Sequence, residues 1–380
     1  MKYVEEFRQG HLARRLAAAI GREADAARQY RLMEFCGGHT HAIFRHGIQD
    51  LMPDNVKFVH GPGCPVCVLP MGRIDNAIQL VEQHDVILCT YGDMLRVPGS
   101  GRRSLLRVKA AGGDVRMVYS TRDALRIARD NPGRQVVFFA IGFETTTPPT
   151  AVAIREAQAE GLENFTVFCN HVLTPAAMRH ILSSSTAPVS IDGFLGPAHV
   201  STVIGSRPYE FVPRAFRRPV VIAGFEPLDV MQSTLMLVRQ INEGRHEVEN
   251  EYTRAVTREG NTRAQALVAG VFELRPLFEW RGLGLMPDSA LQIRADYGAI
   301  DAERRFPVPA ISAPDVKGCE CPSILRGVLK PTDCRLFGTV CTPENPMGAC
   351  MVSSEGACAA YWSYGRFRRS PVPVGVEAVS

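Results

Sequence analysis

The stretch Val136-Val-Phe-Phe-Ala-Ile-Gly-Phe-Glu-Thr-Thr-Thr-Pro-Pro-Thr150 contains the pattern on which the fold prediction rests. Its first residues, up to Ile141, form an uninterrupted apolar run, which is typical of a strand buried on both faces. A turn rich in glycine and threonine follows, and a helical pattern then continues from about residue 150 to 160. The stretch therefore predicts a strand, a turn and a helix, the repeating unit of proteins built on parallel sheets.

The same alternation repeats along much of the chain. Short apolar runs predict further strands at residues 32–35, 56–59, 85–89, 115–119, 165–169, 191–195 and 219–223, and most of them are followed by a helical pattern. Parallel strands need such crossover helices, so the alternation favours βαβ units. We therefore predict an α/β fold with two parallel-sheet βαβ lobes, followed by a mostly helical or irregular C-terminal domain.

Changes of pattern along the 380 residues suggest where the domains begin and end. Domains usually hold about 100–200 residues, so two or three are expected. Residues 1–35 are predicted to be a helical segment that packs on a later domain, residues 36–131 one α/β lobe and residues 132–243 a second. Residues 244–380 form the predicted C-terminal domain, and its tail beyond about residue 366 is predicted to be poorly ordered.

The composition is that of an ordinary globular protein, with 46% hydrophobic residues, 22% charged residues and a net charge of +4. The basic residues form no stripe and no nucleic-acid-binding module is recognisable, so nucleic acid is not an expected partner. The N-terminus is charged and lacks the apolar core of a signal peptide, and no apolar run approaches the ~20 residues that span a bilayer. We therefore predict a cytoplasmic protein that does not bind membranes.

The eleven cysteines are unevenly distributed. Stable disulfides are rare in a reducing compartment, so dense cysteine indicates metal or redox chemistry. Six lie close together near the C-terminus: Cys319, Cys321, Cys334, Cys341, Cys350 and Cys358. The last four lack the paired spacing of zinc ligands, so these thiols favour an iron–sulfur cluster. Their density disfavours the alternative, in which they are merely buried apolar side chains.

A second cysteine motif is Cys36-Gly-Gly-His39-Thr-His41, which follows a predicted strand. Loops at the carboxyl ends of strands bind ligands in open α/β sheets. His39 and His41 could bind metal, donate hydrogen bonds or move protons. From this motif alone, a simple turn at the start of a helix is an equally good interpretation.

The third motif is Gly61-Pro-Gly-Cys64-Pro-Val-Cys67, a CxxC before a helical pattern. A helix N-terminus lowers the pKa of a thiol, which suits metal binding or disulfide exchange. The spacing does not distinguish between these two roles. Two further cysteines, Cys89 and Cys169, lie alone within predicted strands.

Glu144 lies in the turn that follows the strand at 136–141, and this turn resembles an anion-binding loop before a helix. A capped helix start is the better interpretation of the turn alone, with Glu144 as an acid–base group or a surface charge. His171 and His199 also follow strands and are interpreted as parts of structural turns. The chain lacks a P-loop and a convincing dinucleotide-binding glycine motif, so nucleotide use is not expected.

Taken together, four motifs resemble the HypD family of hydrogenase maturation proteins. They are CGGHTHAI at 36–43, GPGCPVC at 61–67, GFETT at 142–146 and FGTVCTPENPMGACMVSSEGACAAY at 337–361. The resemblance covers nearly the whole chain. It implies two α/β lobes and an iron–sulfur domain with a [4Fe–4S] cluster, together forming a scaffold on which Fe(II) acquires two cyanide ligands and one carbon monoxide. The implied partners are a small HypC-type chaperone and a HypE-type cyanide donor.

The resemblance also implies the roles of particular residues. Cys36, Cys64 and Cys67 correspond to thiols associated with the iron. The cluster ligands fall in the C-terminal set, for which Cys334, Cys341, Cys350 and Cys358 are favoured and Cys319 and Cys321 are competitors.

These observations lead to a redox hypothesis. Electrons would pass from the cluster to Cys64 and Cys67 and then to the iron site. His39 and His41 would form hydrogen bonds with the diatomic ligands or move protons, and Glu355 would also relay protons. An alternative is a cluster-dependent thiol–disulfide reductase, and another is an assembly platform without redox turnover. Whether such a scaffold counts as an enzyme is left open.

Overall fold

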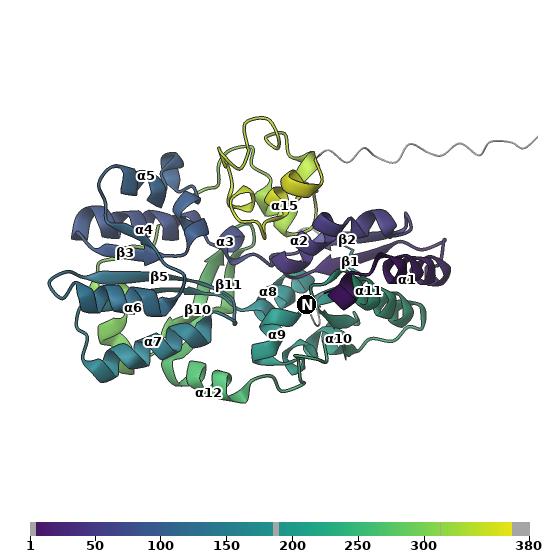
Figure 1. The fold of residues 1–380 in the computed structure, drawn as a ribbon, viewed down its shortest axis with the longest axis horizontal. Helices are drawn as coiled ribbons and strands as arrows, with labels where there is room; N and C mark the ends of the chain where they lie inside the picture. The colour runs from purple at the N-terminus through teal and green to yellow at the C-terminus, as the bar shows by residue number, and fades with distance from the viewer. Residues whose placement is uncertain (1–4, 185–189, 312, 367–380) are drawn as a thin grey trace, which may run out of the picture.

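The computed structural model describes residues 5–184, 190–311 and 313–366 (Figure 1). Two sheets flanked by helices lie side by side, and the C-terminal segment lies over the region where they meet (Figure 1). The predicted α/β fold class is confirmed. None of the described helices combines the length and the apolar character that crossing a bilayer requires. The tail that we predicted to be poorly ordered lies outside the described residues.

The first sheet has five parallel strands in the order β2-β1-β7-β8-β9. Helices α1 (Gly10–Glu23) and α11 (Pro227–Asn242) pack against each other beside it, and α2 (Gly37–His46) leads out of β1 (Figure 1). Its strands are β1 (Tyr30–Glu34), β2 (Val56–His60), β7 (Gly193–Pro197), β8 (Val220–Ala223) and β9 (Val248–Asn250).

The second sheet has four parallel strands in the order β4-β3-β5-β6. Every residue of β5 and β6 is buried, as the unbroken apolar runs predict. The strands are β3 (Ile87–Thr90), β4 (Val115–Met117), β5 (Val136–Gly142) and β6 (Phe165–His171), and the helices are α4 (Met71–His84), α5 (Leu105–Ala110), α6 (Thr121–Asp130) and α7 (Thr147–Glu160).

The strands do not divide between the two sheets at the predicted boundary between residues 131 and 132. Strands on both sides of that boundary, from 87 to 171, share the second sheet. The chain leaves the first sheet after β2, builds the whole second sheet and then returns at β7. All these units have the same local pattern, so the sequence cannot tell which strands pair over a long distance.

The region predicted to be helical or irregular after residue 244 contains a long antiparallel hairpin, β10 (Phe272–Trp280) and β11 (Gly284–Ile293). It follows α12 (Thr262–Val271), and β11 packs against β6. Pro276 and Pro287 interrupt the alternation of the two strands, and the register shifts between Arg275 and Leu277. Proline is tolerated in strands only at edges and bulges, which is why the sequence pattern concealed this hairpin.

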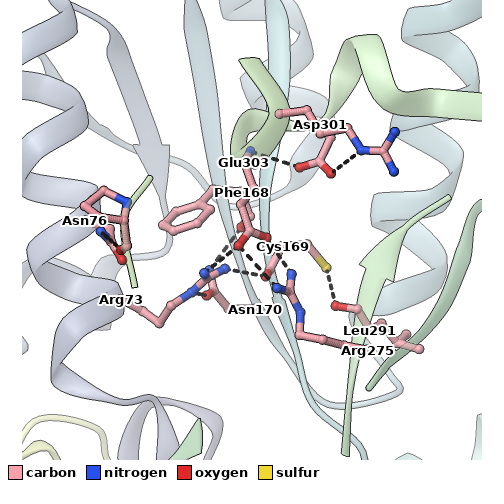
Figure 2. Close-up of polar contacts among 11 residues, drawn as sticks. Arg73, Asn76, Phe168, Cys169, Asn170, Arg275, Leu291, Asp301 and Glu303 are labelled. Carbon is pink, nitrogen blue, oxygen red and sulfur yellow. Dashed lines mark hydrogen bonds and ion pairs between the residues drawn. The ribbon is translucent and has the colours of Figure 1, made fainter. Parts of the chain in front are cut away.

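A partly buried ion network connects the hairpin to the second sheet. Figure 2 shows the Glu303 carboxylate between the guanidinium groups of Arg73 in α4 and Arg275 in β10. Arg73 also donates to the carbonyl oxygen of Cys169 over 2.9 Å. Burial by itself would raise the pKa of Glu303, but the charges and hydrogen bonds of the two arginines outweigh it and lower this pKa to about 2. The network anchors α4, the helix that follows the CxxC motif.

Candidate functional site

The carboxyl ends of the two parallel sheets face a common cleft of about 400 Å³. Ligands bind at this position in open α/β sheets because the loops after the strands converge there. The second sheet contributes Tyr91, Val118 and the turn 141–143 with Thr145 and Thr146, while Pro65, Val66 and His199 come from segments that follow strands of the first sheet, and Ser353, Ser354 and Glu355 from the C-terminal segment.

Cys36 lies at the end of β1, immediately before α2, and is 1% exposed. Its backbone N–H donates to Glu34 Oε2 over 3.1 Å. Glu34 is fully buried and also contacts His60 Nδ1 at 2.7 Å and the Thr40 hydroxyl. A buried carboxylate is tolerated only when its oxygens have such partners. Glu34 therefore fixes the loop that presents Cys36.

The Cys36 thiol contacts a histidine from another strand of the same sheet. Its Sγ lies 3.0 Å from Nδ1 of His199, near the start of α9 (Ala198–Ile204) and directly after β7. Burial lowers the pKa of His199 to about 4. Burial and then the charge of Glu355 raise the pKa of Cys36 well above its usual range. Both shifts favour the neutral forms. The Cys36 S–H can then donate to Nδ1 of His199 when the imidazole carries its own proton on Nε2.

The CxxC motif lies beside Cys36, in the segment that follows the adjacent strand β2. Cys64 and Cys67 form a disulfide at the start of α3 (Pro65–Val68), and both are buried. A Cβ atom on Gly63 would lie 2.4 Å from the Cys36 backbone nitrogen, so the approach of the two loops requires glycine here. Gly37 also donates its N–H to the Gly63 carbonyl oxygen over 3.1 Å. The structure thus brings the predicted iron-associated motifs together.

The six cysteines between 319 and 358, which we call the C-terminal cysteine group, also come together. Cys321 occupies a central position, since its thiol shares hydrogen bonds with those of Cys319, Cys350 and Cys358. Electrostatic interactions connect Cys358 to Cys334, and Cys341 to Cys358 and Cys319. All of them are buried except Cys319, which is partly exposed. The two competitors of the sequence prediction therefore belong to the same group as the four favoured residues.

The surroundings of this group fit an anionic iron–sulfur cluster. The Arg281 guanidinium is buried beside it, and none of its nitrogen atoms has a hydrogen-bond partner among the described residues. A buried cation of this kind and a set of soft thiol donors match a thiolate-bound cluster. Within the described ranges, no three His, Cys, Asp or Glu side chains are arranged to hold a single metal ion.

The two histidines of the Cys36 motif contact protein groups, and neither lines the cleft. Nε2 of the fully buried His39 donates to the Ala223 carbonyl oxygen over 2.9 Å, which links α2 to β8. Nε2 of His41 lies 3.0 Å from the Tyr364 hydroxyl in α15 (Ala357–Tyr364). Burial lowers the pKa of both imidazoles. In this structure they connect the Cys36 helix to its surroundings.

Glu144 is turned away from the cleft, although its neighbours Thr145 and Thr146 line it. Its carboxylate accepts the Thr174 backbone N–H over 2.9 Å and contacts the Thr174 hydroxyl at 3.0 Å. Burial raises its pKa to about 7. It borders a separate groove of about 570 Å³ beside α8 (Thr174–Ser183). The acidic residues that line the cleft are instead Asp93 and Glu355, and the pKa of Glu355 is raised by burial and then by the charge of Asp93.

Sequence reasoning gave no role at the site to two residues that hold Cys36. His199 was interpreted as part of a turn, because only the pairing of β7 with β1 places it next to the thiol. Glu34 did offer a signal, since it is the one acidic residue in the strand Tyr30–Glu34 and directly follows the apolar residues Leu32 and Met33. A carboxylate in such a strand needs partners, which here belong to the functional loop.

Comparison with known proteins agrees with the motifs that form the cleft. The family model described as "HypD: Hydrogenase formation hypA family" matches residues 11–365. The chain belongs to the HypD family. The predicted resemblance to HypD is therefore confirmed, and the match includes the Cys36 loop, the CxxC motif and the whole C-terminal cysteine group.

Three relatives illustrate the extent of the HypD likeness. Hydrogenase maturation factor HypD2 of Bradyrhizobium diazoefficiens is 65% identical over 372 residues, 97% of this chain and 98% of that protein. Hydrogenase maturation factor HypD of Cupriavidus necator is 65% identical over 376 residues, 98% of this chain and 99% of that protein. Hydrogenase maturation factor HypD of Escherichia coli K12 is 47% identical over 370 residues, 96% of this chain and 98% of that protein.

Proposed function

We propose that this protein acts in hydrogenase maturation as the scaffold on which iron receives two cyanide ligands and one carbon monoxide. The observation that carries the proposal is the cleft in which Cys36 contacts His199 at 3.0 Å and the buried Cys64–Cys67 disulfide lies on the neighbouring loop. The names of its relatives, which are hydrogenase maturation factors, support the same assignment.

Iron is the substrate of this site, and Cys36 is the residue that would hold it. Without a metal ion the thiol is protonated, because burial and then the charge of Glu355 raise its pKa. A bound metal ion deprotonates a coordinating thiol outright. The proton passes to Nδ1 of His199, which lines the cleft and can release it to water there. The resulting thiolate is an electron-rich ligand suited to low-spin Fe(II), and a cysteine of a HypC-type chaperone would add a second one.

Cys64 and Cys67 would supply the electrons for cyanide transfer. A HypE-type donor carrying an R–S–C≡N group needs two electrons and one proton to release cyanide as R–SH and CN⁻. Oxidation of the two thiols to a disulfide provides two electrons and two protons, so one proton is left over for the cleft. The S–C bond breaks, the Cys64–Cys67 bond forms and cyanide binds the iron. The Cys64–Cys67 disulfide corresponds to the oxidised form that this step would produce.

Four members of the C-terminal cysteine group would hold a [4Fe–4S] cluster. Cys334, Cys341, Cys350 and Cys358 remain the favoured ligands, and the central position of Cys321 supports Cys319 and Cys321 as their competitors. When bound, the cluster supplies single electrons, which is the chemistry needed to restore the dithiol. Arg281 would offset its charge within the protein interior.

A thiol–disulfide reductase acting on other proteins is the alternative, and burial of the redox pair argues against it. Cys64 is 3% exposed and Cys67 is fully buried, so a protein disulfide has no access to either sulfur in this conformation. Disulfide exchange requires direct attack of a thiolate on the partner sulfur. A small linear group such as a thiocyanate has a much lower steric requirement.

The test is infrared spectroscopy of the full chain purified anaerobically with its HypC-type partner. We expect paired cyanide bands and a carbonyl band in the wild-type complex, and their loss in Cys36→Ala. The matched control is Cys89→Ala, which removes an equally buried cysteine from β3, away from the cleft. This variant should keep all the bands.

Two outcomes would contradict the scaffold. The bands could survive in Cys36→Ala, or they could be missing from wild-type complexes whose iron–sulfur absorption is intact. The second outcome would favour the reductase, and reduction of a model protein disulfide by the chain would then be measured in wild type and Cys64→Ala.

A further inference from the structure

The tip of the β10–β11 hairpin is inserted between the CxxC helix and the C-terminal cysteine group. The Arg281 backbone N–H donates to the Val68 carbonyl oxygen in α3 over 2.7 Å. On the opposite side, Gly282 has a φ of 79°, and a Cβ atom there would lie 2.6 Å from Cα of Pro322. Pro322 follows Cys321 directly at the start of α14 (Cys321–Leu325). The tip thus contacts both redox-active segments.

The Arg281 side chain is buried in this position without adequate compensation. It is 1% exposed, and none of its three nitrogen atoms has a hydrogen-bond partner among the described residues. Its nearest carboxylate is that of Asp315, with 3.2 Å between Nε and Oδ1, and Asp315 is itself partly exposed. A guanidinium carries five N–H donors, and burying such a cation is strongly unfavourable unless anions or acceptors surround it.

The charge of Arg281 is directed at the cysteine group. Gly282, the next residue along the tip, abuts Pro322 beside Cys321, and the Arg281 charge acts on the thiols of Cys319 and Cys350. Glu279, on the same hairpin, also feels this charge, but it faces Asp315 as well. The anionic partner that the guanidinium lacks therefore belongs on the side of the thiols.

We propose that Arg281 is the counter-ion of the anionic cluster held by the C-terminal cysteine group and that it stabilises the reduced form of that cluster. The inference rests on the proposed function only because it requires the cluster to be present. A [4Fe–4S] core with four thiolates goes from a charge of about −2 to about −3 when it takes one electron from an external reductant, with no proton involved. A buried, weakly screened cation favours the more negative state and so raises the reduction potential.

The experiment is a reductive titration of the full chain, followed by electron paramagnetic resonance of the cluster. We expect Arg281→Gln to lower the equilibrium constant for reduction at least tenfold, which for one electron is a shift of about 59 mV to lower potential. Arg281→Lys should shift it less, because the charge remains. Asp315→Asn removes the opposing carboxylate, so it should shift the potential upward.

Arg326→Gln is the matched control. Arg326 lies on the segment that follows Cys321, but it is partly exposed and donates to the Pro322 carbonyl oxygen over 3.2 Å. Its charge is screened by water, so its loss should leave the potential nearly unchanged. Equal potentials in wild type, Arg281→Gln and Asp315→Asn, with equal cluster content, would overturn the inference.

The design separates this inference from the proposed function. Wild-type protein without cluster absorption would refute the cluster itself, whereas unchanged potentials in cluster-loaded variants would refute only the role of Arg281. If Arg281→Gln fails to take up a cluster, Asp315→Asn decides, because that variant leaves the buried cation in place and changes a partly exposed residue.

Discussion

The two groups of cysteines in this protein are positioned in different ways. Cys36, Cys64 and Cys67 follow paired parallel strands, and backbone hydrogen bonds, Glu34 and a close contact at Gly63 hold their loops. The C-terminal cysteine group lies in a segment whose described regular structure consists of short helices. A parallel sheet can therefore hold thiols in position before a substrate arrives. On an irregular segment, the positions of the thiols would depend on the group that they bind.

The largest expected difference is in amide protection: removal of the proposed cluster should lower it in the segment of the C-terminal cysteine group and leave it unchanged in the sheets. Iron chelation under mild oxidation, followed by hydrogen exchange with mass spectrometry, should reduce the protection of amides in 318–365 by about 1000-fold or more, because the proposed cluster would supply much of the folding free energy there. Amides in β1, β2, β5 and β6 should keep their protection. Equal protection of 318–365 before and after chelation would show that this segment folds without a metal.

The sheet region should instead be sensitive to its partly buried ions. Glu303→Gln should lower the free energy of unfolding by about 2 kcal/mol, because it leaves Arg73 and Arg275 without their partly buried carboxylate partner. Glu160→Gln, which breaks an exposed ion pair with Arg129, is the control and should change stability little. Urea unfolding measures both variants, and equal midpoints would contradict the anchoring role of Glu303.

The Glu303 carboxylate should also make the free energy of unfolding depend on pH. The pKa of Glu303 is lowered from 4.5 to about 2 in the folded protein. Its stabilising contribution is therefore present above about pH 4.5 and is lost as the pH falls toward 2, because folding then no longer favours the ionised form. The difference in stability between wild type and Glu303→Gln should shrink over that range.

Near Cys36, His199 lines the cleft and His39 does not, so the two histidines provide a direct comparison. His199→Gln should reduce iron bound to the purified complex by roughly 10–100-fold with little loss of stability, as expected for a partner that orients a metal-binding side chain. His39→Gln should mainly lower the melting temperature, since His39 donates to the Ala223 carbonyl oxygen and packs against the Phe225 ring inside the protein. Iron content and thermal unfolding are measured on both. Loss of iron in His39→Gln but not in His199→Gln would instead assign the role at the iron site to His39.

The smallest expected effect concerns the charge beside Cys36. Burial and then Glu355 raise the pKa of this thiol, so Glu355→Gln should lower it and speed alkylation of Cys36 by iodoacetamide about three- to tenfold at pH 9. Below the thiol pKa the rate should rise about tenfold per pH unit in both proteins. Peptide mass spectrometry of labelled Cys36 gives the rates. Identical rates would mean that burial alone determines the reactivity of this thiol.

Local sequence signals were sufficient for every strand of the two parallel sheets except the short β9 (Val248–Asn250). All eight predicted strands are present, because unbroken apolar runs such as 136–141 and 165–169 have few alternatives to a buried strand. The hairpin at 272–293 was missed, since its prolines disturb the alternation that identifies strands. The assignment of strands to sheets was also missed, because it depends on pairing between residues more than a hundred positions apart.

By itself, the sequence determined the α/β class, the three cysteine motifs and the HypD family, because each depends on residues that are neighbours along the chain. Only the tertiary structure decided that His199 is the histidine at Cys36, that Glu144 faces away and that Arg281 lies beside the C-terminal cysteine group. Those contacts join β1 to β7, β5 to α8 and a hairpin tip to a distant segment. Strand pairing and packing create them, and they leave no periodic signal in the local sequence.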